Sequence, residues 1–442
     1  MKFRMRIQAI LPVVALLVVA PPLQATNGHF LHGVGAINSA MGGAGVAATG
    51  DILGSFYLNP AGLHDGNGTR VALSMELFKA DRTISSSVPG FGAGSTRSKS
   101  EFVPVPAFAW ATAINDKVTV GLGGLGIGGF GVDYPQDNTN PVLAPRPFGF
   151  GQIFSNFGLM KVSPALAFAV NDKLQLGFAL NVDWATLAVD PMPVASPAAD
   201  PGPDGQPFTQ DDRAFYSSAT AADGAFGVGF QAGLIYKATG NLNLGLAYSS
   251  KQVFDDFEYN SVYENPNLPN FGQARIITFA MDVPAVYIGG FSYHNDQLMV
   301  NGEARYITYS KTAGFDKQGF DQTGAVQGFG WDDIWVLAGG LQLSPSEKVA
   351  LRGGWNWSQN PISEDVAFFN GPAPAIVQNH LTLGLGFTPF EGVDVNLAYY
   401  HVFENSVTGP MYGPTGPIPG SSVTHKMFED SMIATFTFTP KK

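Results

Sequence analysis

Most of the chain after residue 69 alternates apolar side chains with small or polar ones. In residues 173–189, for example, Leu174 and Leu176 flank Gln175, and the alternation continues to the end of the segment. A period of two sends successive side chains to opposite faces of a strand, so this pattern predicts β-strands with one apolar face. Fourteen segments have it: 69–80, 100–114, 118–130, 153–170, 173–189, 219–237, 242–257, 273–293, 297–310, 331–343, 348–359, 377–387, 393–404 and 425–439.

The connections between these segments alternate between short and long. The short ones are 115–117, 171–173, 238–241, 294–297, 344–347 and 388–392. The long ones, rich in Gly, Pro, Asp and Ser, are about 81–99, 131–152, 190–218, 258–272, 311–330, 360–376 and 405–424. Outer-membrane barrels have tight periplasmic turns, long external loops and an even number of strands. The sequence therefore predicts an all-β fold, a transmembrane antiparallel β-barrel of about fourteen strands spanning residues 67–442.

The first 25 residues have the pattern of a secretory signal peptide. A basic start with Lys2 and Arg4 precedes an apolar run over 10–20, and Leu23-Gln24-Ala25 fits a cleavage site. The apolar run is shorter than the roughly 20 residues that a spanning helix needs. We therefore expect residues 1–25 to direct export and then to be removed.

Residues 26–66 do not alternate and are rich in Gly and Ala. A barrel of this size encloses an open lumen, since sixteen-stranded barrels already hold an aqueous channel. A segment of this length is well sized to plug the lumen, so we predict an N-terminal hatch. The alternative is a disordered periplasmic tail, which the apolar content of the segment disfavours.

The composition of the chain excludes or disfavours several classes of function. Net charge is −11, which would repel a nucleic-acid backbone, and the absence of Cys excludes disulfides and thiolate metal sites. The Gly121-x-Gly123-x-x-Gly126 spacing occurs in nucleotide-binding loops, but no helix follows it here. No catalytic set or cofactor motif is recognisable, so we expect neither an enzyme nor a bound cofactor.

The remaining candidates for chemistry are polar groups of the predicted hatch, loops and lumen. His29 and His32 have a spacing that suits a metal, but we expect them to be polar residues of the hatch surface. The acidic, Pro-rich stretch 200–212 has carboxylate side chains that could bind Ca²⁺, although a solvated loop is the simpler interpretation.

Alternation also predicts which charged side chains point into the lumen: Glu76, Lys161, Glu303, Arg305, Arg352 and Asp394. A ligand carboxylate requires a cation, because an unpaired buried charge is costly, and Arg305 and Arg352 are the candidates. The alternative is that they pair with Glu303 and Asp394 to stiffen the lumen wall. An aromatic hydrocarbon needs no cation.

Three parts of the chain resemble the family of FadL/TodX-type outer-membrane transporters of long-chain fatty acids and aromatic hydrocarbons. They are 26–30 with 41–47 and 59–63, then 331–335 with 339–340 and 351–355, and finally 380–387 with 394 and 399–400. One departure is the end of the chain, where Phe438 is followed by four further residues. Barrels of this kind usually end on the aromatic residue that the barrel assembly machinery recognises.

The resemblance implies a monomeric barrel in the outer membrane of a Gram-negative bacterium, with a kink in its third strand. In this family, hydrophobic substrate enters a lumenal pocket and leaves sideways into the lipid through a gap at the kink. The hatch motif that meets the kink falls on Asn59, Pro60 and Ala61. The corresponding strand is unusually rich in glycine, with Gly121, Gly123, Gly124, Gly126, Gly128 and Gly129.

Two other functions remain possible for such a sequence. A porin for hydrophilic solutes, or an adhesive barrel acting through its loops, would have the same strand pattern but no need of a plug. An outer-membrane lipase would need a Ser–His pair on the lipid-facing side. The predicted hatch favours passive uptake of hydrophobic small molecules over both.

Overall fold

The computed structural model describes residues 26–65, 68–99, 102–200, 202, 213–220, 224–413 and 416–440. The expected signal peptide, residues 1–25, lies outside the described residues, as does almost all of the stretch 200–212.

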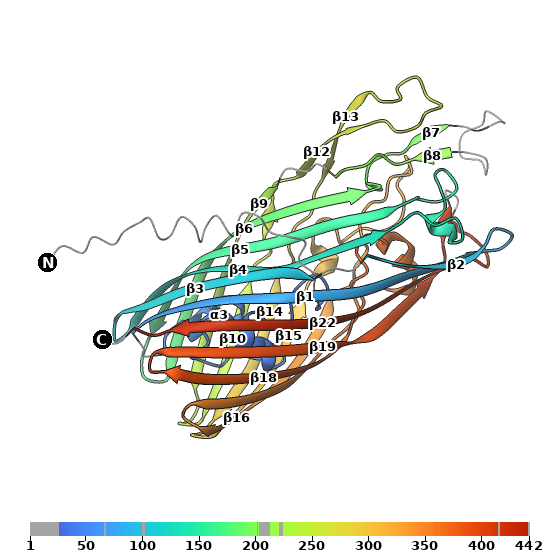
Figure 1. The fold of residues 1–442 in the computed structure, drawn as a ribbon. Coiled ribbons are helices and arrows are strands. Elements are labelled where there is room, and N and C mark those ends of the chain that lie inside the picture. The colour runs from blue at the N-terminus through green and yellow to red at the C-terminus, as the bar shows by residue number, and fades with distance from the viewer. Residues whose placement is uncertain are drawn as a thin grey trace.

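Within the described residues, fourteen strands close an antiparallel barrel (Figure 1), which confirms the predicted fold. They are β1 (Thr69–Val88), β3 (Val103–Asn115), β4 (Val118–Tyr134), β5 (Ile153–Ala169), β6 (Leu174–Asp190), β9 (Ala225–Lys237), β10 (Leu242–Ser249), β14 (Val286–His294), β15 (Leu298–Ile307), β16 (Ile334–Ser346), β17 (Val349–Ser358), β18 (Asn379–Phe390), β19 (Val393–Gly409) and β22 (Ser422–Phe438). Each pairs with its neighbours in sequence, and β1 pairs with β22 from Val71↔Phe438 to Ser87↔Ser422, which closes the ring.

The short connections gather at one end of the barrel and the long ones at the other (Figure 1). The long connections carry small elements of their own: β2 (Gly92–Arg97), β7 (Ala198–Asp200), β8 (Arg213–Phe215), β11 (Val253–Phe254), β12 (Phe257–Val262), β13 (Ala274–Phe279), β20 (Tyr412–Gly413), β21 (Gly416–Pro417), η3 (Pro141–Leu143), η4 (Tyr309–Lys311) and η5 (Glu364–Asn370). β12 and β13 form a hairpin that continues the wall beyond β10 and β14.

The two faces of the wall follow the alternation of the sequence. On β6, Leu176 and Phe178 are 42% and 50% exposed on the outside, whereas Gln175 is 3% exposed and faces the lumen. An apolar outer surface and a polar lumen are what a bilayer imposes on a barrel. No helix among the described residues is long and apolar enough to cross a bilayer.

Two predicted strands are wrong in their extent. Segment 273–293 is divided into β13 and β14, and segment 242–257 is interrupted after β10. Pro284 lacks an N–H for the ladder, and the Asp282 carboxylate accepts the Phe254 N–H at 3.0 Å and pairs with Lys251 at 3.0 Å. Only an isolated backbone bridge between Gln252 and Val283 remains of the ladder at this level, and the Asp282 side chain adds to it. This change leaves the alternation of the sequence unaltered.

Other strands are longer than predicted, as in β1, which continues to Val88 rather than ending near residue 80. Residues 81–88 are mostly polar and belong to the end of the barrel with the long connections. The outer face needs apolar residues only where it meets lipid, so alternation marks the lipid-facing part of a strand and not its full length.

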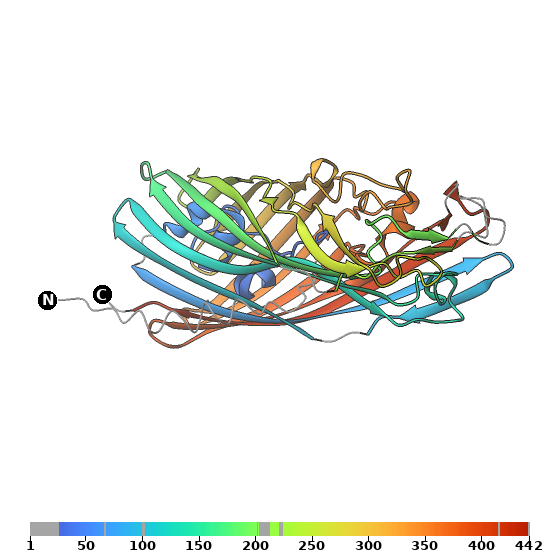
Figure 2. The same ribbon diagram turned by 90° about the horizontal axis from the view of Figure 1, so that it is seen from above.

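The N-terminal segment folds inside the barrel, near the end with the short turns (Figure 2). It forms α2 (Gly35–Ala40), α3 (Ile52–Leu58) and η2 (Pro60–Leu63), and most of its residues are buried. Gly43 has φ +83, and a Cβ atom there would lie 2.0 Å from the His32 carbonyl oxygen, so only glycine fits this turn. The hatch predicted from composition is a compact plug.

Candidate functional site

The wall of the barrel opens between β3 and β4. Pairing of these strands runs from Asn115↔Val118 to Ala107↔Leu125 and stops there, while β4 continues to Tyr134. Every residue from Gly123 to Val132 is buried, so β4 no longer presents an outer face and bends into the lumen. The bend coincides with a bulge against β5 between Gly126 and Gly128.

Prolines on β3 explain where the pairing stops. Pro104 and Pro106 pair with Leu77 and Met75 of β1, and that ladder continues through both of them. Their missing N–H groups therefore belong to the edge of β3 that faces β4. The β3 edge therefore lacks two hydrogen-bond donors where the wall opens. The glycines of β4 alone did not predict this feature of β3.

The hatch fills the open edge of β4 with its own first residues. Phe30 bridges Gly128 in antiparallel fashion, the Leu31 N–H donates to the Ile127 carbonyl at 3.0 Å, and the Gly129 N–H donates to the His29 carbonyl at 2.8 Å. A Cβ atom at Gly128 would lie 2.1 Å from the His29 carbonyl oxygen. Gly128 is thus required for the N-terminal strand to dock in the gap.

An apolar pocket lies directly behind this strand, in the lumen. Phe30, Ile127, Val286 and Ile307 line it, together with the polar side chains of Tyr57, Lys161, Gln252 and Arg305. Its volume is about 50 Å³. A cavity of roughly 150 Å³ is known to hold benzene, so this pocket is too small for an aromatic ring in the present structure.

An aromatic cluster holds His29 beside the pocket. The His29 ring stacks on Phe315 with centroids 5.3 Å apart and on Phe30 at 4.3 Å, and the Tyr309 hydroxyl accepts the His29 N–H at 3.0 Å. Neither ring nitrogen has a hydrogen-bond partner among the described residues. Burial lowers the pKa of His29 to about 3, so the imidazole is neutral.

His29 and His32 lie on the hatch surface that packs against the barrel, where Phe315 and Tyr400 contact their rings, and both are fully buried. The His32 Nε2 atom lies 3.1 Å from the Ser39 carbonyl oxygen, and its ring packs edge-on against Tyr400. Burial lowers the pKa of His32 to about 4. Among the described residues, no three His, Cys, Asp or Glu side chains gather as a possible metal site.

The two candidate arginines lie on different sides of the hatch. Arg305 lines the pocket, where its Nε donates to Glu303 Oε1 at 2.6 Å and its terminal nitrogen to the Gly43 carbonyl at 2.6 Å. The other oxygen of Glu303 accepts the N–H groups of Gly45 and Val46 at 2.9 and 2.7 Å. The alternative interpretation expected the pairing of Arg305 with Glu303, but the pair also clamps the hatch to β15, which that interpretation did not include.

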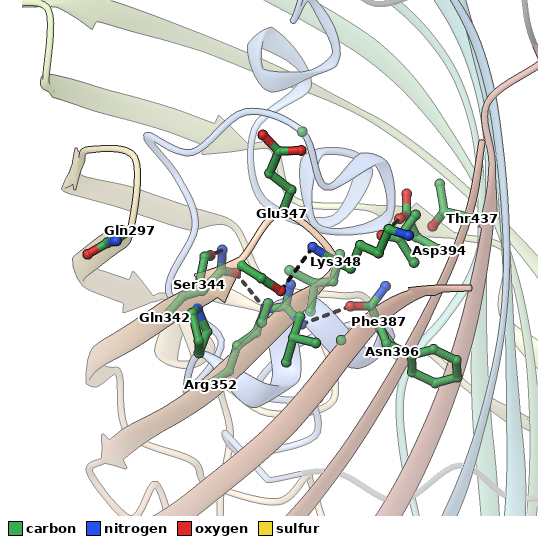
Figure 3. Close-up of a pocket in the computed structure, with 18 of the residues that line it drawn as sticks. Gln297, Gln342, Ser344, Glu347, Lys348, Arg352, Phe387, Asp394, Asn396 and Thr437 are labelled. Atoms are coloured by element: carbon green, nitrogen blue, oxygen red, sulfur yellow. Dashed lines mark hydrogen bonds between the residues drawn. The ribbon is translucent and has the colours of Figure 1, made fainter. Parts of the chain in front are cut away.

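Arg352 lines a larger polar cavity of about 650 Å³ at the short-turn mouth of the barrel (Figure 3). Its guanidinium donates to Gln342 Oε1 at 2.7 Å and Asn396 Oδ1 at 2.8 Å. Asp394 lines the same cavity and accepts the Thr388 hydroxyl. This cavity is a polar vestibule below the hatch, and Arg352 does not line the apolar pocket.

The motif Asn59-Pro60-Ala61 lies against β6 and β9 rather than at the bend of β4. The Asn59 side chain donates to the carbonyls of Val46 and Leu234 at 2.7 and 3.1 Å and accepts the Ala61 N–H at 3.0 Å. Gly177 lies under the motif, where a Cβ atom would be 2.0 Å from the Ala61 nitrogen. The motif anchors the hatch to the wall.

The other glycines of β4 have different neighbours. Phe56 of α3 packs on Gly121 and Gly123, whose added Cβ atoms would lie 2.9 and 2.7 Å from its ring. Gly124 pairs with Phe108 of β3, just before the ladder ends. Gly126 pairs with β5 at the bulge. The glycines therefore serve both hatch packing and the bend.

Sequence reasoning missed the hatch residues that meet the wall. Tyr57 donates its hydroxyl to the Leu31 carbonyl, and its ring lies between Lys161 and Arg305 with each cation 5.8 Å from the ring centroid. Burial raises the pKa of Tyr57 to about 12, which keeps the hydroxyl neutral. Alternation placed Lys161 in the lumen, but no local pattern indicates which hatch residue it faces.

Comparisons with known proteins agree with this geometry. The model of a family described as outer membrane protein transport protein (OMPP1/FadL/TodX) matches residues 17–437. Among proteins with curated descriptions, none matches the chain at a significant level.

Solved structures show the same fold. The toluene transporter TodX of Pseudomonas putida has a TM-score of 0.68 and 16% identity, covering 93% of this chain and 99% of its own. A FadL homologue of Pseudomonas aeruginosa has a TM-score of 0.68 and 18% identity, covering 95% and 100%. The toluene transporter TbuX of Ralstonia pickettii has a TM-score of 0.63 and 20% identity, covering 92% and 99%.

Proposed function

The chain belongs to the outer membrane protein transport protein family (OMPP1/FadL/TodX), and we propose that it admits small, uncharged hydrophobic compounds through its wall. The family comprises transporters of the Gram-negative outer membrane rather than enzymes. One observation carries the proposal: the wall opens between β3 and β4, and a hatch strand fills the opening beside an apolar pocket.

This arrangement matches the physical problem of moving a hydrophobic solute. Such a solute gains nothing from a water-filled pore, because water does not solvate it favourably. Withdrawal of residues 29–31 from β4 joins the pocket to the gap, and the gap faces lipid. The solute then passes from pocket to bilayer without crossing bulk water. The concentration gradient of the solute drives this flux once the hatch has moved.

The charges around the pocket favour an uncharged substrate. Arg305 is paired with Glu303, and Lys161 faces Asp183 across the β5–β6 pair. Each cation thus has a carboxylate beside it, and a ligand carboxylate would add an uncompensated negative charge. This favours aromatic hydrocarbons, the compounds named for the toluene transporters among the similar structures, over long-chain fatty acids.

Uptake of radiolabelled toluene and oleate by cells producing the protein tests the substrate class. We expect saturable uptake of toluene well above that of cells without the protein, and little uptake of oleate. Saturable oleate uptake that toluene does not inhibit would refute the charge argument. Steady ion conduction by the purified protein, without uptake of either compound, would favour the porin alternative.

Restoring the missing donors of β3 tests the lateral exit. We expect Pro104→Val with Pro106→Val to let β3 pair further along β4 and to reduce toluene uptake several-fold. Pro164→Val is the matched control, because Pro164 lies in β5, away from the gap, and should leave uptake unchanged. Equal uptake by both variants, with normal amounts of folded barrel, would argue against exit between β3 and β4.

A further inference from the structure

A patch of buried polar side chains lies on the lumen face of the wall beside the apolar pocket. It consists of Lys161 on β5, Asn181 and Asp183 on β6, Gln231 on β9 and Gln252 after β10. All five are at most 4% exposed. A polar group in this setting needs hydrogen-bond partners to offset the loss of water.

Several atoms of the patch lack such partners among the described residues. They are both carboxylate oxygens of Asp183, the amide nitrogen of Asn181, and the amide oxygens of Gln231 and Gln252. The remaining polar atoms are engaged: Lys161 donates to the Phe56 carbonyl at 3.0 Å, and Gln231 donates to the Tyr57 carbonyl at 3.1 Å. The open positions are therefore mostly acceptors, with one donor.

Strand register places the patch next to residues that line the pocket. Lys161 pairs with Asp183, and Asp183 pairs in turn with Gly227 of β9. A Cβ atom at Gly229, the partner of Asn181, would lie 2.2 Å from Gln252 Oε1, so Gln252 reaches across this glycine towards β6. Lys161 and Gln252 both line the pocket. Asn181 and Asp183 lie on β6, the strand between β5 and β9, and a ligand in the pocket reaches them past these two side chains.

The chemistry of the patch selects one kind of ligand group. A carboxylate is disfavoured, because it donates no hydrogen bond and would meet the Asp183 carboxylate. A cation is disfavoured by Lys161, which faces the same aspartate. A hydroxyl fits, since it donates to an Asp183 oxygen and accepts from the Asn181 amide.

We infer that this patch binds the hydroxyl group of a phenol or alcohol whose apolar part occupies the lumen pocket. The inference rests on the proposed function, because it names a substrate class for the same pocket. It assigns Asp183 as the specificity-determining acceptor. Toluene and p-cresol, which share one ring and one methyl group and differ by a hydroxyl, are the matched probes.

Equilibrium binding of the two probes to protein in amphipol, at neutral pH and with protein-free amphipol as the blank, tests the inference. Apolar burial alone favours toluene, because p-cresol is the better solvated by water. We expect the reverse order, with p-cresol binding tighter. Asp183→Asn should weaken p-cresol roughly tenfold, since a hydrogen bond to a charged group exceeds one to a neutral group by about 1 kcal/mol or more. Toluene affinity should change little.

Two further variants keep the test decisive. Asp394→Asn removes a carboxylate from the vestibule below the hatch and should leave both affinities unchanged. Gln252→Met removes an acceptor that lines the pocket and should also weaken p-cresol selectively, which covers the case in which Asp183→Asn does not fold. Heat-modifiable migration in gels reports whether each barrel is folded.

The outcomes separate this inference from the proposed function. Toluene binding without tighter p-cresol binding, or equal losses for both probes in Asp183→Asn, overturns the hydroxyl site and leaves hydrophobic uptake standing. Binding of neither probe overturns both. Selective loss of p-cresol in Asp183→Asn and Gln252→Met, but not in Asp394→Asn, supports the site.

Discussion

At the scale of single residues, docking of the first hatch residues depends on a neutral imidazole. The pKa of His29 is about 3 in the docked state and about 6.5 when the ring meets water. The contribution of His29 to the free energy of docking is therefore fully present above pH 6.5 and is lost as the pH falls from 6.5 towards 3. We expect docking to weaken by about 2 kcal/mol between pH 7 and pH 5 through this group. Lower protection factors of the Leu31 and Gly129 amides at pH 5, with exchange compared with the intrinsic rate at each pH, would report it.

His29→Phe is the control for this prediction, because it keeps an aromatic ring in the cluster and removes the titration. His32 has a pKa lowered to about 4 and titrates in both proteins. Burial raises the pKa of Asp51 to about 6, so its contribution runs the other way: stability rises as the pH falls from 6 towards 3.8. The difference between wild type and His29→Phe isolates His29. An identical pH dependence in the two would contradict the prediction.

Glu303 is the second residue on which the hatch depends. Its carboxylate accepts two hatch N–H groups and pairs with Arg305. Glu303→Gln leaves the buried guanidinium without a counter-charge, and breaking a buried pair costs about 3–5 kcal/mol. We expect faster hydrogen exchange of the Gly45 and Val46 amides in this variant.

The double variant Glu303→Gln with Arg305→Met tests the cause. Removing both charges leaves no unpaired ion in the lumen, so the double variant should protect the hatch amides better than Glu303→Gln alone. If the double variant loses as much amide protection as Glu303→Gln and Arg305→Met lose together as single variants, the ion pair is not what holds the hatch. The hydrogen bonds from the Gly45 and Val46 N–H groups then carry the effect.

At the scale of elements, the strand that fills the gap depends on the absence of a side chain at one position. Gly128→Ala places a Cβ atom against the His29 carbonyl oxygen, so residues 29–31 lose their place on β4. We expect increased hydrogen exchange at Leu31 and greater ion conductance in planar bilayers, with the barrel intact.

Gly353→Ala in β17 is the matched control. A Cβ atom there would meet nothing closer than 3.7 Å, so both readouts should match the wild type. Wild-type conductance and exchange in Gly128→Ala would contradict the docking role assigned to this glycine.

The elements also show which features of the fold the sequence pattern predicts and which it does not. Alternation identified the fourteen wall strands and the inward charges because lipid and lumen impose opposite polarities on the two faces of every strand. It missed the break between β13 and β14, which depends on Pro284 and on the Asp282 side chain. It also missed the pairing of 29–31 with 127–129, since contacts between segments so far apart leave no periodic trace in either one.

The structure brings only some of the candidate site residues together. Arg305 lines the pocket and Gly128 pairs with Phe30, but Arg352 lies in the vestibule below the hatch. Alternation gives the side of the wall on which a charge lies, not its height in the barrel relative to a plug. Asn181 and Asp183 belong to a predicted strand, but alternation does not show that Gln252 and Phe254 pack over the β9 glycines that pair with them.

At the scale of the whole molecule, the hatch separates two compartments of the lumen. The apolar pocket of about 50 Å³ lies on one side, and the polar vestibule of about 650 Å³ lies on the other. The wall itself does not need the plug, because β1 and β22 close the ring by direct pairing. Deletion of residues 26–65 should therefore leave a folded barrel with an open, water-filled lumen.

We expect this deletion to convert a barrel with little ionic conductance into one that conducts steadily, and to abolish saturable toluene uptake. The pocket loses Phe30 and Tyr57, and β4 loses the hatch residues that pair with its open edge. Shortening the β12–β13 hairpin by residues 266–271 removes a loop outside the lumen pocket and should change neither property. If the barrel without its hatch still takes up toluene saturably, then the pocket and gap behind residues 29–31 are not the route, and uptake follows another path through the wall.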